Sequence, residues 1–233
     1  MTNQTNRAGL RGLTAKDYAY NEIKQGIIEG KLPPNLPVRE EEISSKLKIS
    51  RTPLRGAFER LEFEKMVVRQ SNGRLKIAPI SVQEVKEIFK VRSKLEEIAV
   101  FEATERASDE DIKNLYEIAE SIRKTTQKGN IEEILHHGGE FHLYLYQLSG
   151  NRVVSNFLSQ LNDHIHRYRR LVPKQSLNRI MEEGEEHLEI VDCIAKRDAK
   201  GAELAMKKHI ENSLKSAVTA IGIYEKNKAD SIW

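Results

Sequence analysis

The sequence predicts a mainly α-helical protein with two domains, a small N-terminal domain that ends in a β-hairpin and a larger domain made only of helices. Three observations lead to this prediction. Apolar residues recur at three- and four-residue spacing along most of the chain, which is the period of amphipathic helices. The pair Asn72-Gly73 separates two short β-prone stretches and is a strong hairpin signal. Residues 1–80 contain 15 Lys and Arg against 9 Asp and Glu, whereas residues 81–233 contain 23 against 26.

Length and composition narrow the class of protein. The 233 residues are 39% hydrophobic, enough for a real core, yet no apolar run approaches the roughly 20 residues needed to cross a bilayer. The N-terminal stretch MTNQTNRAGLRG lacks the apolar centre of a signal peptide. A single cysteine excludes an internal disulfide. We therefore expect a globular cytoplasmic protein without a membrane partner.

The first third of the chain predicts three helices. Apolar residues recur at helical spacing in DYAYNEIKQGIIEGKL, and the prolines of KLPPNLP are expected to stop this helix. The segment REEEISSKLKIS predicts a short second helix, with Ile43 and Leu47 on one face. In SRTPLRGAFERLEFEKM, Ser50 or Thr52 can cap a third helix, and Pro53 is tolerated in its first turn.

The third helix and the hairpin after it carry the basic charge of this region. Arg51 and Arg55 lie four residues apart and share a face near the start of the helix, away from its apolar stripe. In the second strand of VVRQSNGRLKIAPI, apolar residues alternate with Arg74 and Lys76, so one face packs and the other is cationic. Three helices followed by a basic hairpin is the order of a winged helix-turn-helix, whose third helix enters the major groove. The alternative is a three-helix bundle with a solvated basic face.

The stretch GIIEGKLPPNLPVREEEISSKLKISRTPLRGAFERLE resembles the DNA-binding domain of the GntR family of bacterial transcription regulators, above all in SRTPLR. The resemblance implies that residues 10–79 bind operator DNA. The chain departs from the family pattern at Gly56, where an acidic residue is common, and a glycine there costs about 1 kcal/mol of helix stability. The residues that the resemblance places at bases, phosphates or the wing tip are Arg39, Ser50, Arg51, Thr52, Arg55, Gly73 and Arg74.

Residues 80–228 are expected to form an all-helical bundle of six or seven helices. Its first helix opens with a capping box, Ser81 with Glu84, and Arg92 falls within its apolar stripe. The region contains no glycine-rich phosphate loop, no paired-cysteine motif, and no serine or cysteine nucleophile beside a base. These absences argue against the common classes of enzyme site.

Histidines distinguish this second region from a plain helical core. All seven histidines of the chain lie between positions 136 and 209. Three of them, His142, His187 and His209, are in register with apolar residues and should point inward from three different helices. Imidazoles that converge in this way can hold a divalent cation, although a lone inward histidine is usually a hydrogen-bonded core residue.

The segments RSKLEEIAVFEA, EFHLYLYQLSGN and EEHLEIVDCIAKRDAKGAELAMKKHI resemble the ligand-binding domain of the FadR branch of the same family. In metal-binding members of that branch, three histidines and an aspartate hold the ion beside a bound carboxylate. By this resemblance His142, His187 and His209 would be the ligands, and Arg92 would help to bind the acid. The position of the aspartate is Gly138, which supplies no carboxylate.

Zinc or nickel can still bind to three imidazoles, with water or an effector carboxylate in the vacant position. Glu140, two residues before His142, is expected to point elsewhere. The remaining histidines are interpreted as solvated or interhelical: His136, His137, His164 and His166.

The leading hypothesis is a homodimeric transcription regulator, a repressor, that binds double-stranded operator DNA and responds to a small organic acid. Dimerisation is expected because paired winged helices read half-sites about one DNA turn apart. One alternative is a DNA-binding regulator whose helical domain binds neither metal nor effector and only dimerises. The other is an enzyme with zinc on three histidines, a reading that leaves the winged helix without a role.

Overall fold

The computed structural model describes residues 13–128, 131–169 and 177–230. These residues form nine helices and a two-stranded sheet, and the chain divides into two compact units between Ile80 and Ser81. In chain order the elements are α1 (Ala15–Ile28), α2 (Glu40–Leu47), α3 (Arg51–Phe63), β1 (Val67–Arg69), β2 (Leu75–Ile77), α4 (Val82–Arg106), α5 (Asp109–Lys128), α6 (Ile131–Ser149), α7 (Arg152–Arg169), α8 (Leu177–Ala195) and α9 (Ala199–Asp230).

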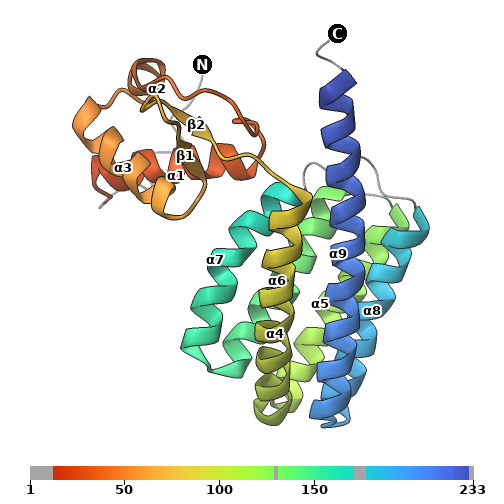
Figure 1. Ribbon diagram of the computed structural model, residues 1–233. Helices are drawn as coiled ribbons and strands as arrows, with labels where there is room; N and C mark the ends of the chain where they lie inside the picture. The colour runs from red at the N-terminus through yellow and green to blue at the C-terminus, as the bar shows by residue number, and fades with distance from the viewer. Residues whose placement is uncertain (1–12, 129–130, 170–176, 231–233) are drawn as a thin grey trace, which may run out of the picture. The chain divides into compact units, whose positions relative to one another are not determined.

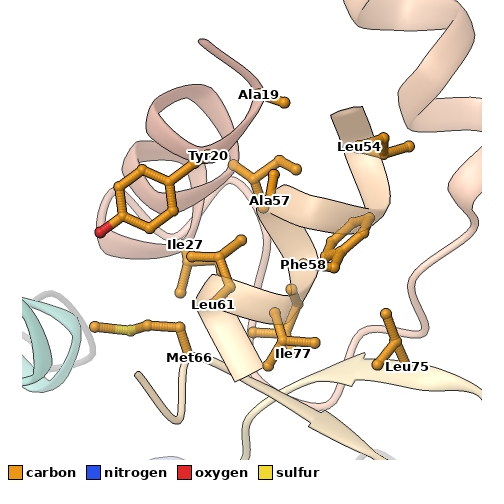
Figure 2. Packing of buried hydrophobic residues seen from close by; sticks show 12 residues of the cluster. Ala19, Tyr20, Ile27, Leu54, Ala57, Phe58, Leu61, Met66, Leu75 and Ile77 are labelled. Carbon is orange, nitrogen blue, oxygen red and sulfur yellow. The ribbon is translucent and has the colours of Figure 1, made fainter. Parts of the chain in front are cut away.

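The N-terminal unit is a winged helix-turn-helix, as predicted. Helices α1 and α3 pack against each other, and the antiparallel strands β1 and β2 pair Val67 with Ile77. Figure 2 shows the aromatic ring of Phe58 and the side chain of Leu61 on α3 within the apolar cluster that these elements share. The apolar stripe of α3 therefore faces the core, which leaves the opposite side of the same helix to solvent.

The first helix ends earlier than the sequence predicts. It stops at Ile28, before the prolines that were expected to end it. Gly30 adopts a left-handed conformation with φ of 73°, and the N–H of Leu32 donates to the carbonyl of Gly26 at 2.9 Å. Glycine enters this conformation without steric cost, so the reversal of the chain is made by Gly30.

The hairpin turn forms at the predicted Asn-Gly pair. Gly73 has φ of 78°, and its N–H donates to the carbonyl of Gln70 at 2.8 Å. The side-chain oxygen of Asn72 accepts from the N–H of Arg74 at 3.0 Å. These bonds set the wing tip, with Gly73 and Arg74 both exposed.

The C-terminal unit is a bundle of six helices in the described ranges, which confirms the predicted all-helical architecture. The two long helices α4 and α9 run side by side, α4 also packs on α6 and α7, and α5 packs on α8 and α6 (Figure 1). Ser81 caps α4 by accepting the N–H of Glu84 at 3.1 Å, as the capping box predicts. None of the helices in the described ranges combines the length and apolar character that a bilayer crossing requires.

Candidate nucleic-acid interface and metal centre

Helix α3 presents a polar, exposed surface in its first two turns. Ser50 stands at the N-cap position, and Arg51, Thr52 and Arg55 follow on the solvent side. The side chains of Arg51 and Arg55 are 60% and 64% exposed. Ser50 takes the N-cap position that the sequence predicts for it or Thr52, but its side chain makes no capping hydrogen bond. Its hydroxyl is therefore not committed to the helix end.

Three consecutive glutamates at the start of α2 bind the arginines that the sequence analysis places at DNA. Nε of Arg55 donates to Glu40 at 3.1 Å, and Nη2 of Arg51 donates to Glu41 at 3.1 Å. In the same way, Nη1 of Arg39 donates to Glu42 at 2.8 Å. These pairs were not predicted from the sequence, although the run of three acidic residues beside Arg39 was a visible signal.

In the helical unit, His142 on α6, His187 on α8 and His209 on α9 meet in the interior. All three are buried, with exposed fractions of 2%, 1% and 0%. One nitrogen from each ring lies within 4.8 Å of the others. The ring centroids of His187 and His209 are 4.5 Å apart, and those of His142 and His209 are 5.3 Å apart. The sequence predicts that each points inward, and the helix packing brings them together.

Acceptors behind two of the rings orient their imidazoles. Nδ1–H of His142 donates to the carboxylate of Glu96 on α4 at 3.1 Å, and Nδ1–H of His209 donates to that of Glu186 at 2.9 Å. A hydrogen bond to Nδ1 places the ring proton there and leaves the Nε2 lone pair for a ligand. Among the described residues, Nε2 of His209 is buried without a hydrogen-bond partner.

The third ring has a backbone acceptor. Nδ1–H of His187 donates to the carbonyl of Glu183 at 2.6 Å. The same tautomer is therefore set for all three imidazoles, and Nε2 carries the lone pair in each.

A buried ion pair adjoins the histidines. Nε of Arg92 donates to Glu96 at 3.0 Å, Tyr146 donates its hydroxyl to the same carboxylate at 2.7 Å, and Nη2 of Arg92 lies 3.3 Å from Nε2 of His142. Burial opposes ionisation of Glu96, but His142, Arg92 and these hydrogen bonds hold its pKa at about 2. Burial lowers the pKa of His142 to about 4 despite the nearby Glu96 carboxylate. The imidazole is therefore neutral at pH 7, as a metal ligand must be.

The donor set fits a divalent cation even though Gly138 supplies no carboxylate. Gly138 is buried on α6, one turn before His142. Negative charge comes instead from Glu96 and Glu186. Glu96 accepts a hydrogen bond from His142, and Glu186 accepts one from His209. Such carboxylate–histidine pairs orient metal ligands and raise their basicity. Neither glutamate was predicted from the sequence, because their histidine partners lie 46 and 23 positions away in the chain.

The other histidines lie apart from this cluster. His136 and His137 bond to Glu140 on one turn of α6, at 3.3 Å and 2.9 Å, and the side chain of His136 is 67% exposed. Glu140 thus points away from His142, as expected. On α7, His164 and His166 are half-buried, and the ring of His166 lies beside Gly139.

Comparisons with known proteins agree with the two-unit architecture. The family described as "Bacterial regulatory proteins, gntR family" matches residues 15–77, and the family described as "FCD domain" matches residues 87–212. The HTH-type transcriptional regulator YdhC of Bacillus subtilis (strain 168) is 27% identical over 194 residues, which are 83% of this chain and 86% of YdhC.

The Uxu operon regulator of Haemophilus influenzae is 30% identical over 210 residues, covering 82% of this chain and 76% of that protein. The solved structure of E. coli McbR/YncC superposes with a TM-score of 0.74 at 19% identity, covering 91% of this chain and 99% of that one. At that identity the structural likeness shows the fold alone.

Proposed function

Because the chain belongs to the GntR family of bacterial regulatory proteins, with an FCD domain behind its winged helix, it is a DNA-binding transcription regulator rather than an enzyme, and we propose a division of its roles. Residues 10–79 bind operator DNA, although residues 10–12 lie outside the described ranges. Residues 80–228 bind a small organic acid and dimerise. The homodimer acts as a repressor in the bacterial cytoplasm.

One observation carries the assignment of the DNA-contacting surface. Helix α3 buries its apolar side in the core of the unit, while Arg51 and Arg55 are exposed near its N-terminus. Arginine forms paired hydrogen bonds with guanine in the major groove, and an exposed hydroxyl such as that of Ser50 or Thr52 suits an adjacent phosphate. Arg39 and the wing tip at Gly73 and Arg74, which are all exposed, are assigned to the DNA backbone.

The DNA assignment is tested with duplexes selected from a random-sequence pool by the full-length protein. Arg51→Ala and Arg55→Ala should each lower affinity for the selected duplex by roughly 5- to 150-fold, since each good base contact is worth about 1–3 kcal/mol. Lys31→Ala is the matched control, because it removes one exposed positive charge outside α3. Unchanged binding of both arginine variants at moderate salt would overturn the assignment.

For the helical unit we propose a divalent cation, zinc or nickel, on His142, His187 and His209. The common tautomer of the three rings and the buried Nε2 of His209 support this assignment. When bound, such an ion supplies positive charge and open coordination positions for a carboxylate. Arg92 lies beside the histidines, and its Nη1 has no hydrogen-bond partner among the described residues, so it can donate to the same acid.

Exposed apolar residues on two adjacent helices support dimerisation. Val91 and Ile98 lie seven residues apart on α4, and Val153 and Phe157 lie four apart on α7, which packs against α4. Their exposed fractions range from 43% to 65%. A second copy of the chain is the expected occupant, because operator reading requires two winged helices.

A further inference from the structure

The two arginines of the proposed recognition helix give different nitrogens to their glutamates. Arg55 donates from Nε to Glu40, whereas Arg51 donates from the terminal Nη2 to Glu41. The guanidinium group is a rigid fork with five N–H groups, and its two Nη atoms form the end of that fork. A carboxylate on Nε therefore leaves every terminal N–H of Arg55 available, while Glu41 takes one N–H of the terminal Nη2 of Arg51.

The two glutamates also differ in how firmly they are held. The side chain of Glu40 is 28% exposed, and that of Glu41 is 74% exposed. An exposed ion pair contributes little because solvent screens it and both side chains lose freedom in making it. Both residues belong to the first turn of α2, but Glu40 is the more enclosed, so it is the better fixed of the two acceptors.

We propose that Glu40 is a positioning residue for base recognition, which holds Arg55 by Nε so that both Nη groups face the major groove together. The proposal rests on the assignment of α3 to DNA made above. Bidentate binding of guanine needs two N–H groups in one plane at a fixed spacing, and a restrained guanidinium loses less freedom when it forms these bonds. Glu41 and Glu42 act only through their negative charge, which opposes phosphate.

A substitution of Glu40 has two effects on DNA binding, one through charge and one through Arg55. Loss of a glutamate from this turn removes a negative charge beside the DNA, so it strengthens binding to every duplex. Loss of the restraint on Arg55 weakens binding only where Arg55 reads a base. Glu40 carries both effects, and Glu41 carries the first alone.

The matched variants are Glu40→Ala and Glu41→Ala in the full-length protein, since each removes one charge from the first turn of α2. Fluorescence anisotropy measures affinity for a duplex selected by the wild-type protein and for a scrambled duplex of the same length, at two salt concentrations. Glu41→Ala should tighten binding to both duplexes by the same factor. Glu40→Ala should tighten binding to the scrambled duplex by that same factor. It should also reduce the ratio of the affinity for the selected duplex to that for the scrambled duplex roughly tenfold.

Two further variants show whether Glu40 acts through Arg55. Glu40→Gln keeps an acceptor oxygen without the charge and should restore most of the discrimination. In an Arg55→Ala background, Glu40→Ala should leave the ratio unchanged, because the group that it positions is gone. A merely structural role for Glu40 would not produce this dependence on Arg55.

Each outcome identifies which assignment fails. Equal affinity ratios for Glu40→Ala and Glu41→Ala would overturn the positioning role, even if Arg55→Ala abolishes discrimination. If Arg55→Ala itself leaves the ratio unchanged, the assignment of α3 to the major groove fails first.

Discussion

Nη2 of Arg92 lies 3.3 Å from Nε2 of His142, so the guanidinium donates to the imidazole lone pair that a metal ion would need. Nδ1 of the same ring donates to Glu96, which leaves Nε2 as the acceptor. A cation on His142 must therefore displace Arg92, whose Nη1 and Nη2 would then both be free for a carboxylate. In the proposed site, metal binding and acid binding are therefore linked through this one hydrogen bond, and such a linkage is reciprocal.

Arg92→Lys tests this linkage. Lysine keeps the positive charge that Glu96 requires but lacks the fork that donates to both His142 and an acid. We expect the variant to bind zinc, and we expect succinate to raise the melting temperature further in the zinc-loaded wild type but not in the zinc-loaded variant. Thermal denaturation of the wild type and the variant with zinc, with succinate and with both together measures these melting temperatures. Equal succinate effects in wild type and variant would show that Arg92 does not bind the acid.

The histidine cluster predicts a zinc response that depends on buried rings only. Zinc at about 100 times its dissociation constant should increase the free energy of unfolding by about 2.7 kcal/mol in protein purified without a histidine tag. The melting temperature should rise accordingly. His209→Ala should abolish the rise, and EDTA should reverse it. His136→Ala is the control, because it removes one ring of the separate, mostly exposed group His136, His137 and Glu140, so a response that persists in it comes from the buried rings. No zinc effect in the wild type would favour a domain that only dimerises.

Restoring a carboxylate at position 138 should strengthen the site. Gly138 lies one turn before His142 on α6, so Gly138→Asp adds a negatively charged ligand at the position where the resemblance to metal-binding members of the FadR branch places an aspartate. We expect zinc affinity to rise on the order of tenfold, as measured by competition with a chelating dye. Gly139→Asp adds the same charge one position away and controls for general electrostatics. If both variants bind zinc like the wild type, the three histidines do not form the proposed site.

Glu96→Ala should destabilise the helical unit strongly. The side chains of Arg92 and Glu96 are 1% and 0% exposed, so removal of the carboxylate leaves a buried charge without its partner. The expected loss is about 3–5 kcal/mol in chemical denaturation. Glu87→Ala, on the exposed side of the same helix, should change stability by about 0.5 kcal/mol or less. A small loss of stability in Glu96→Ala would mean that water hydrates the guanidinium of Arg92 in place of the carboxylate.

Phe157→Asp should disrupt the proposed dimer. The side chain is 56% exposed on α7, and a charge there would oppose burial against a second copy. Sedimentation should show a shift towards monomer, with weaker binding to a selected duplex because two half-sites are no longer read together. Leu143→Asp, 48% exposed on α6, is the control. A dimeric Phe157→Asp protein would place the interface elsewhere.

The local features of this protein follow from its sequence because they depend on near neighbours in the chain. The helical period of the apolar residues predicts both the winged helix-turn-helix and the all-helical bundle, and the Asn72-Gly73 pair predicts the turn of the wing. The same period predicts that His142, His187 and His209 are buried and that Arg51 and Arg55 share a solvent face. A face of a helix is a property of spacing alone.

The partners of those residues were decided only by the tertiary structure. Glu96 behind His142, Glu186 behind His209 and Glu40 on Nε of Arg55 each join two different helices. Which side chains meet across an interface depends on the crossing angle and relative shift of the helices, and these are set by the packing of the whole core. The sequence shows that Gly138 supplies no carboxylate. It does not show that the carboxylates of Glu96 and Glu186 bond to the histidines.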